Sequence, residues 1–216
     1  MQEKPCGESN LKGNILKMTN ATAKLKLFQN DSFTPIKEEQ NTLFRLGVGV
    51  VLERDDGRIF YALRSDEDGQ GDWVVDEDGE WVMPQGGIDK GDDIISTLKR
   101  ELFEEAGIRP EHIQPVAQRP DFLAYKFEPL IEPATWIGQA HCWVHCKFLG
   151  DPEKDINLGL NSPQEFQDYG WKTPHEIVQR AQPFHREIYK EVLKGFGFLP
   201  EAKAVPVIMP ALKPGL

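Results

Sequence analysis

The hydrophobic and polar positions of this chain follow two periods, one typical of strands and one typical of helices. A period near two predicts strands over residues 46–52, 58–63 and 138–149, with a turn between the first two. Residues 73–75 and 81–83 flank an acidic turn that contains glycine, which predicts a further hairpin. The middle of the chain therefore contains a sheet.

A period near 3.6 predicts helices over residues 93–106 and about 184–196. Gly107 follows the first helix at the position of a left-handed cap, and Pro183 stands at the start of the second. Thr173-Pro174-His175-Glu176 is typical of a capping box, so a further helix begins there. Strands mixed with a few helices predict an α/β (α+β) layered domain.

The two ends of the chain lack this periodicity. Residues 1–42 have no sustained apolar pattern and are expected to form a flexible N-terminal extension. Residues 197–216 contain four prolines, which block helix and ladder hydrogen bonds, and predict an irregular tail. Residues 43–196 are then one folded domain, as a length of 216 residues allows.

Composition excludes several classes of protein. The chain has 25 Lys and Arg against 35 Asp and Glu, and a net charge of −10 disfavours tracking along DNA or RNA. No apolar run approaches the roughly 20 residues that span a bilayer, so no membrane partner is expected. Three cysteines (Cys6, Cys142 and Cys146) and no visible signal peptide favour a reducing cytoplasm.

Three glutamates gather on one side of the helix predicted over 93–106. On a helical wheel of about 100° per residue, Glu101, Glu104 and Glu105 lie beside the apolar stripe, not opposite it. Such carboxylates repel one another unless a cation joins them, and hard divalent cations bind carboxylates and phosphates together. Arg100 stands four residues before Glu104 and can orient its carboxylate. A merely solvated acidic face is the alternative.

A segment with three glycines precedes this helix. Gly86, Gly87 and Gly91 predict a loop that lets a phosphate chain approach the positive helix N-terminus. A glycine-rich loop alone is weak evidence for a phosphate site. Joined in this order to Arg-Glu-x-x-Glu-Glu-x-Gly, it becomes strong evidence.

The combined pattern resembles the Nudix box, the signature of Nudix hydrolases. It consists of Gly86, five residues, Asp92, seven residues, and Arg100-Glu101-Leu102-x-Glu104-Glu105-x-Gly107-Ile108. Asp92 is the one acid that departs from the family pattern, which has glutamate there. The resemblance implies an α/β/α sandwich with a mixed β-sheet, dependence on Mg²⁺ or Mn²⁺, and cleavage of a nucleoside diphosphate linked to another group.

Further motifs resemble one subfamily, the bacterial RNA 5′-pyrophosphohydrolases and the related asymmetric diadenosine tetraphosphate hydrolases. They are Phe44-Arg45-x-x-Val48-Gly49, Pro84-Gln85-Gly86-Gly87-Ile88-Asp89, Ile137-Gly138-Gln139, Glu165-Phe166 and Pro183-Phe184-x-Arg186-Glu187-x-Tyr189. By this resemblance, the metal ligands are Glu101, Glu104, Glu105 and Glu165, and the catalytic residues are Glu101, Glu105, Glu165 and Arg100. The residues expected at the substrate are Arg45, Arg64, Gly86, Gly87, Gln139, Phe184 and His185.

Several of these assignments keep an alternative. Phe184 is either an aromatic residue near the nucleobase or a core residue of the last helix. Arg45 is either a phosphate contact or a surface salt bridge. The general base is either Glu101 or Glu165, a choice that the sequence leaves open.

The chain also departs from the RNA-processing members of the subfamily. Ala140-His141-Cys142 stands where they tend to have Lys-Gln-Lys, and His185 stands where they have lysine. Each lost lysine removes a phosphate contact. Between Arg64 and Trp81 the chain also carries eight acidic residues and no basic one. These features count against long RNA and suit a short polyphosphate.

Two other metal patterns fail on geometry. On a strand, Cys142 and Cys146 would stand about 13 Å apart at about 3.3 Å per residue, too far to share one zinc ion. Residues 66–77 loosely resemble a calcium loop, but flanking helices are missing and Gln70 is a poor ligand. A solvated acidic hairpin is the better interpretation.

The expected function is metal-dependent hydrolysis of a phosphoanhydride bond by in-line attack of water. The favoured substrate is a diadenosine polyphosphate or a triphosphorylated RNA 5′ end. One alternative is another Nudix substrate, such as ADP-ribose or a nucleotide sugar. A second alternative, of another class, is a non-catalytic module that binds a nucleotide. The oligomeric state is left open.

Overall fold

The computed structural model describes residues 24–29, 32–65, 79–126 and 136–200. Its strands are β1 (Leu25–Gln29), β2 (Ser32–Pro35), β3 (Phe44–Glu53), β4 (Ile59–Arg64), β5 (Trp81–Val82), β6 (Gln85–Gly87), β7 (Ile113–Lys126), β8 (Gly138–Phe148) and β9 (Phe166–Lys172). Its helices are α1 (Ile94–Ala106), α2 (Pro174–Arg180) and α3 (Pro183–Gly195), with short 3₁₀ turns η1 (Glu38–Leu43) and η3 (Pro110–His112).

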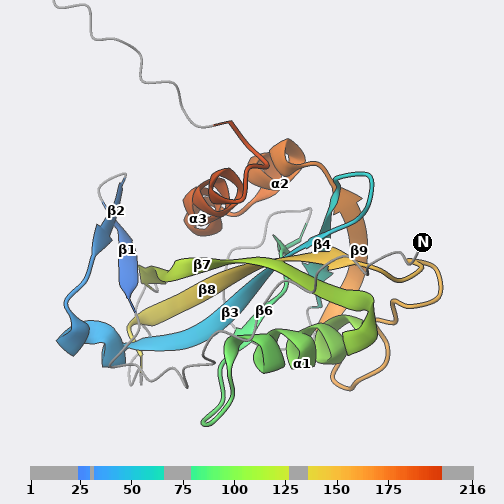
Figure 1. Cartoon of the computed structure of the whole chain (residues 1–216), viewed down its shortest axis with the longest axis horizontal. Coiled ribbons are helices and arrows are strands. Elements are labelled where there is room, and N and C mark those ends of the chain that lie inside the picture. Colours follow the sequence, from blue (N-terminus) through green and yellow to red (C-terminus); the bar gives the residue numbers. More distant parts are fainter. Residues whose placement is uncertain (1–23, 30–31, 66–78, 127–135, 201–216) are drawn as a thin grey trace, which may run out of the picture.

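The strands of the described residues form one mixed sheet between two helical layers. The order is β2-β1-β7-β8-β3-β4-β5, while β6 pairs with β3 and β9 pairs with β4. Helix α1 lies on one face of the sheet, and α2 and α3 lie on the other (Figure 1). This arrangement confirms the α+β class predicted from the sequence. Within the described ranges, no helix has the length and apolar character that a membrane-spanning segment needs.

Strands β3 and β8 pair in parallel and supply the centre of two hydrophobic cores, one on each face of the sheet. Because successive side chains of a strand point to opposite faces, Val48, Val50 and Leu52 pack toward α1. Val51 and Trp143 point the other way and pack with α3, where the Trp143 ring lies 5.6 Å from that of Tyr189. Two buried faces explain why these strands read as nearly continuous apolar runs.

Helix α1 begins and ends where its sequence predicts. The side chain of Asp93 accepts hydrogen bonds from the backbone N–H groups of Ile95 and Ser96, at 2.8 and 2.9 Å. Gly107 ends the helix in a left-handed conformation, with φ of 67°. A β-carbon at Gly107 would also lie 2.6 Å from the carbonyl oxygen of Asn157, so both conformation and space require glycine.

The other predicted elements are found with small shifts at their ends. The strands expected over 46–52, 58–63 and 138–149 are β3, β4 and β8. Thr173 caps α2 through a capping box with Glu176, and the last helix begins at Pro183. In the expected hairpin, residues 81–82 form β5, whereas residues 73–75 lie outside the described residues.

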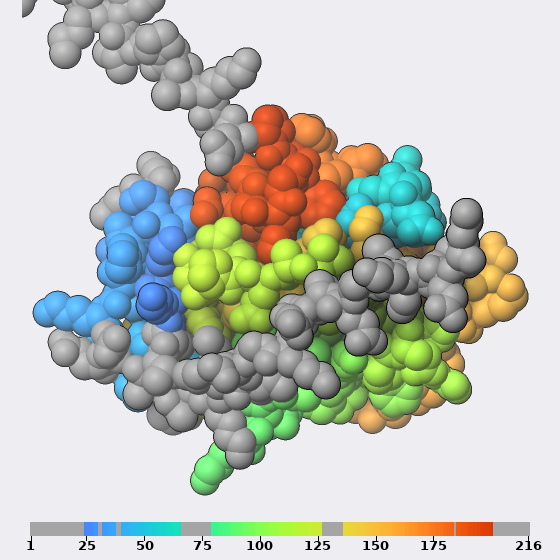
Figure 2. All heavy atoms as spheres, in the orientation of Figure 1, coloured from blue at the N-terminus to red at the C-terminus, as the bar shows by residue number. Residues whose placement is uncertain are grey.

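The expected flexible extension over 1–42 is wrong for Leu25–Gln29 and Ser32–Pro35, which form β1 and β2. Strand β1 pairs in parallel with β7, and Figure 2 shows these N-terminal strands in blue, packed against β7. Leu25 and Leu27 are 2% and 5% exposed, because they enter the core beneath the sheet. Residues 1–23 lie outside the described residues.

The start of the expected C-terminal tail is also ordered. The backbone N–H of Phe198 donates to the carbonyl of Leu193 at 2.8 Å, and the Phe198 ring lies 5.0 Å from that of His145. Phe198 and Leu199 therefore continue the packing of α3 onto the sheet. Residues 201–216 lie outside the described residues.

Candidate active site

The acidic side of α1 meets strand β6 at two glycines. Glu101 and Glu105 are buried, at 9% and 2% exposure, whereas Glu104 is exposed. A β-carbon on Gly86 would lie only 1.9 Å from the carboxyl carbon of Glu101. The Glu101 carboxylate therefore occupies the space that a side chain at position 86 would fill.

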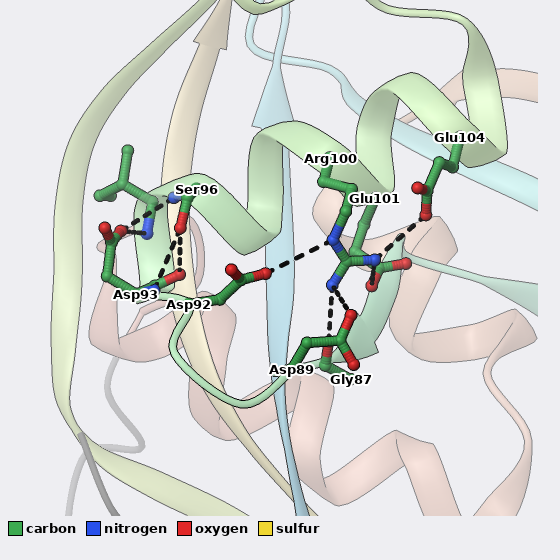
Figure 3. A network of polar contacts seen from close by, with 9 residues as sticks. Gly87, Asp89, Asp92, Asp93, Ser96, Arg100, Glu101 and Glu104 are labelled. Carbon is green, nitrogen blue, oxygen red and sulfur yellow. Dashed lines mark hydrogen bonds and ion pairs between the residues drawn. The ribbon is translucent and has the colours of Figure 1, made fainter. Parts of the chain in front are cut away.

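Arg100 binds the first two glutamates and the strand beside them (Figure 3). Its Nη1 lies 2.8 Å from Oε1 of Glu101 and 3.1 Å from Oε2 of Glu104. Its Nη2 donates a hydrogen bond to the carbonyl of Gly87 at 3.0 Å. The contact with Glu104 is the one that the spacing predicts, and the contact with Glu101 is additional.

The same guanidinium also holds the turn between β6 and α1. Nη2 of Arg100 lies 3.3 Å from Oδ2 of Asp89, and Nε lies 3.6 Å from Oδ2 of Asp92 (Figure 3). The shorter acid at position 92 therefore still pairs with Arg100. One arginine thus fixes the turn, β6 and α1 relative to one another.

The glycines do not form the expected loop, and the helix N-terminus is already satisfied. Gly86 and Gly87 lie in β6 and pair with β3, and of the three glycines only Gly91 has a positive φ, of 103°. Because Asp93 accepts from the first N–H groups of α1, a phosphate is not needed there. The two strand glycines instead leave room for the side chains beside them.

Glu165 completes the acidic group from a distant part of the chain. Nη2 of Arg64 donates to Oε1 of Glu165 at 3.2 Å, and Nε of Arg64 lies 3.8 Å from Oε2 of Glu80. The N–H of Ser65 donates to the carbonyl of Glu165 at 2.7 Å, which fixes the backbone before β9. Arg64 and Glu165 are 101 residues apart in the sequence.

Burial and mutual repulsion shift the protonation of the inner carboxyls. Burial raises the pKa of Glu101, the charge of Arg100 opposes the shift and the charges of Glu104 and Glu165 add to it, so that the pKa lies at about 7. Burial also raises the pKa of Glu105 well above its usual value, with Glu165 and Glu101 adding to the effect. These carboxyls therefore lie close enough to feel one another's charge.

The same group has the chemistry of a hard-cation site. Oε2 of Glu105 is buried and has no hydrogen-bond partner within the part of the chain that the structure describes. A buried, unsatisfied carboxylate oxygen is costly unless a cation or donor reaches it. Carboxylate oxygens are the ligands that Mg²⁺, Mn²⁺ and Ca²⁺ prefer. Arg100 contacts Glu101 and Glu104, and Arg64 contacts Glu165. Among the described residues, no three His, Cys, Asp or Glu side chains lie close enough together to hold a metal ion as they stand.

Arg45 lies on the opposite side of β6 from Glu101. A β-carbon on Gly87 would lie 2.5 Å from Nη2 of Arg45, so the guanidinium rests on that glycine. Its Cζ lies 5.8 Å from the centre of the Trp136 ring. Arg45 thus makes a cation–π contact with Trp136. Among the described residues it does not form the surface salt bridge that was the alternative to a phosphate contact.

Gln139 and His185 lie in a polar cluster on the α3 side of the sheet. The hydroxyl of Tyr125 donates to Oε1 of Gln139 at 3.0 Å. Nε2 of His185 lies 3.3 Å from Nε2 of Gln85, and the His185 ring stacks on Tyr189 at 5.2 Å. His185 is only 3% exposed and lies behind Gln85, and its expected contact with the substrate stays a prediction. The side chain of Phe184 is not among those described.

Two buried histidines of this cluster, His141 and His185, are neutral. Burial lowers the pKa of His141 and of His185 to about 3. The charge of Arg45 adds to the shift at His141, and His141 and Arg64 add to it at His185. Both rings are therefore uncharged near neutral pH, and the cluster provides hydrogen bonds without positive charge.

The cysteines and histidines of the rejected zinc pattern lie on opposite faces of β8. Cys142 and Cys146 point into the core beneath α1, whereas His141 and His145 point to the opposite face of β8. Burial raises the pKa of both thiols to about 12, which makes them inert core residues.

The sequence reasoning missed Trp136 and Tyr125. Trp136 immediately precedes the Ile137-Gly138-Gln139 motif, and this neighbouring motif is the feature of the sequence that could have indicated it. Tyr125 lies in a strand that the pattern did not predict, so only its pairing with Gln139 in the sheet brings it to the site.

Comparison with known proteins gives the class of protein. The model of the NUDIX domain matches residues 43–192, and the chain therefore belongs to the Nudix family. The RNA pyrophosphohydrolase of Dinoroseobacter shibae is 38% identical over 157 residues, which cover 71% of this chain and 91% of that protein. Nudix hydrolase 25 of Arabidopsis thaliana is 36% identical over 163 residues, covering 71% and 86%.

A solved structure agrees on the fold. The MutT protein of Methanosarcina mazei Go1 superposes with a TM-score of 0.50 at 16% identity, covering 71% of this chain and 96% of that one. The chain is thus a Nudix hydrolase, and enzymes of this family generally use divalent metal ions.

Proposed function

We propose that this Nudix hydrolase cleaves a phosphoanhydride bond in a nucleoside polyphosphate, with Mg²⁺ or Mn²⁺ as cofactor. The favoured substrates are a diadenosine polyphosphate and a triphosphorylated RNA 5′ end. The observation that carries the proposal is the group of Glu101, Glu105 and Glu165, which includes a buried carboxylate oxygen with no described partner. Arg64 contacts Glu165, and Arg45 lies on the other side of β6 from Glu101.

The metal ligands in this proposal are Glu101, Glu104, Glu105 and Glu165. A bound divalent cation supplies charge neutralisation at the phosphoryl group and lowers the pKa of the attacking water. Arg100 keeps Glu101 and Glu104 in place through its contacts at 2.8 and 3.1 Å. Either Glu101 or Glu165 accepts the proton of the water, which attacks phosphorus in line with the leaving phosphate.

The substrate phosphates lie along the edge strand β6. The Glu101 carboxylate lies against Gly86 and the Arg45 guanidinium lies against Gly87, so phosphates bound along this strand would meet both groups. Arg45 lies on one side and Glu101 on the other. Arg64, which already contacts Glu165 and Glu80, supplies further positive charge near the carboxylates.

The choice between the two substrates depends on the length of the substrate and on the positive charge available to bind it. The relative from Dinoroseobacter shibae is named an RNA pyrophosphohydrolase, which supports the RNA 5′ end. Ala140, Cys142 and His185 stand where the RNA-processing members tend to have lysine, and they favour a short polyphosphate because fewer cations are available to bind a longer chain. A cytoplasmic location stays a prediction from the cysteine content.

A substrate panel tests the proposal. Triphosphorylated RNA, diadenosine tetraphosphate, ADP-ribose and a nucleotide sugar are each incubated with Mg²⁺ or Mn²⁺, and the products are resolved by chromatography. Turnover of either of the first two supports the proposal. Exclusive turnover of ADP-ribose or the sugar nucleotide contradicts the substrate class, and nucleotide binding without any product supports a non-catalytic module.

A variant pair links the activity to this site. Glu105→Gln removes the most deeply buried carboxylate of the group and should abolish metal-dependent turnover. Glu111→Gln changes an exposed glutamate just beyond α1 and should retain it. Full turnover by Glu105→Gln would show that the assignment is wrong.

A further inference from the structure

Two large apolar side chains are exposed on adjacent strand ends beside the site. Leu43 is 42% exposed and Trp136 is 39% exposed. The backbone N–H of Ile137 donates to the carbonyl of Leu43 at 2.8 Å, so these two chain segments run together just before β3 and β8 begin. A single exposed apolar residue is ordinary on a protein surface. A tryptophan in contact with an arginine of the proposed phosphate site is more specific.

Arg45 connects this tryptophan to the glutamates. Its guanidinium lies 5.8 Å from the Trp136 ring centre and also rests against Gly87. The neighbouring residue of the same strand, Gly86, is in contact with Glu101. The order along this path is therefore an indole ring, a cation on one side of β6, the backbone of two glycines, and a carboxylate on the other side of β6.

This order matches the chemical order of a nucleotide. A nucleobase is a flat aromatic ring, and stacking on an aromatic side chain contributes roughly ten- to a hundredfold in affinity per base. The phosphates attached to the nucleoside need a cation within reach, and an arginine binds phosphate oxygens through paired hydrogen bonds. The end of the phosphate chain must reach the carboxylates.

We propose that Trp136 stacks on a nucleobase of the substrate and so selects for a nucleoside at one end of the polyphosphate. Arg45 holds the indole by its cation–π contact and binds the phosphates next to that nucleoside. This inference rests on the proposed function, since it takes the phosphate chain to run over β6 to Glu101. It adds a specificity residue outside the Nudix box, immediately before the Ile137-Gly138-Gln139 motif.

The test compares ligands with and without a base. Diadenosine tetraphosphate carries two adenines, whereas inorganic tripolyphosphate carries none. Trp136→Ala should raise the KM for diadenosine tetraphosphate at least tenfold, change kcat less than threefold, and leave the inhibition constant of tripolyphosphate unchanged. Trp136→Phe keeps an aromatic face and should restore the KM to within about threefold of the wild type.

Two results would overturn the inference. One is an unchanged KM for diadenosine tetraphosphate in Trp136→Ala. The other is an equal weakening of diadenosine tetraphosphate and tripolyphosphate, which would mean that Trp136 only supports Arg45. An exposed residue of another region, Leu160→Ala, serves as the control for surface truncation and should change neither constant.

Calorimetric titration separates this inference from the proposed function. If the wild type binds diadenosine tetraphosphate but cleaves neither it nor triphosphorylated RNA, the proposed function fails. A selective loss of that binding in Trp136→Ala, with recovery in Trp136→Phe, would then still support the stacking residue. Absence of binding by the wild type would overturn the inference as well.

Discussion

The carboxylate of Glu101 lies where a side chain of Gly86 would have to be. The carboxyl carbon is 1.9 Å from the position of a β-carbon on Gly86, far inside van der Waals contact. Gly86 is not among the glycines with positive φ, so its backbone conformation does not require glycine. Glycine is needed at this position because a glutamate from the neighbouring helix fills the space.

Gly86→Ala should therefore displace Glu101 and reduce activity while the protein stays folded. A displacement of about 1 Å in a catalytic group can cost about a hundredfold in rate, and we expect kcat/KM to fall by about that factor. The measurement is kcat/KM on the best substrate of the panel, together with a thermal melt. Glu101 lies at the edge of the core, so the melt should change little.

Gly159→Ala is the matched control for this substitution. The nearest atom to a β-carbon at Gly159 is Oδ1 of Asn157 at 3.7 Å, an ordinary contact distance. Its φ is also not in the left-handed region. Equal activity of the two alanine variants would contradict the role assigned to the Gly86–Glu101 contact.

Arg100→Lys should weaken metal activation without removing the charge. The guanidinium reaches Glu101, Glu104 and the carbonyl of Gly87 at the same time, which a single ammonium group cannot do. Loss of a group that orients metal ligands typically costs ten- to a hundredfold in metal affinity. The Mn²⁺ concentration for half-maximal activity should rise by about that factor.

Arg109→Lys is the control for the loss of a guanidinium near this helix, because Arg109 is exposed just after Gly107. It should leave the Mn²⁺ dependence unchanged. A rise in KM for substrate with an unaltered Mn²⁺ dependence in Arg100→Lys would instead mean that Arg100 binds the phosphates directly.

The local features of the site could be predicted because their causes are local. The apolar stripe of α1 fixes which side of the helix is buried, and Asp93 and Gly107 fix its ends. The same periodicity places Glu101 and Glu105 at the edge of that stripe, where the structure buries them. Glu104 lies further round the helix and is exposed, as its position on the wheel indicates.

The sequence does not predict the strands that depend on pairing with distant parts of the chain. Strand β7 contains Pro115 and Pro120, and its pairing with β8 shifts register near both prolines, so its alternation is broken. Strand β1 has five residues, of which only Leu25 and Leu27 are buried, and it is stabilised by a partner almost a hundred residues away. No short pattern in the sequence identifies either strand.

Leu27→Ala should reveal the contribution of this N-terminal strand to stability. Leu27 is 5% exposed and lies in the core beneath the sheet, so truncation should lower the free energy of unfolding by about 2–4 kcal/mol. Leu149→Ala, at a position that is 56% exposed, should lower it by less than about 1 kcal/mol. Urea unfolding followed by circular dichroism measures both values, and equal effects would mean that β1 contributes no core packing.

The two buried histidines predict a loss of stability in mild acid. His141 and His185 have pKa values of about 3 in the folded protein, because burial disfavours their charged forms. Between pH 6.5 and 3 the unfolded chain therefore binds protons that the folded chain does not, so the free energy of unfolding falls as the pH falls. Each histidine contributes a slope of up to about 1.4 kcal/mol per pH unit in that window.

His185→Gln isolates one of these contributions. Other groups titrate in the same window, including Glu101, whose raised pKa acts with the opposite sign. These groups are present in both proteins, so the difference in slope between wild type and variant reports His185. Urea unfolding between pH 5 and 6.5 should give a slope smaller by about 1 kcal/mol per pH unit. His175→Gln, at an exposed position, should leave the slope unchanged, and an unchanged slope in His185→Gln would mean that folding does not shift the pKa of His185.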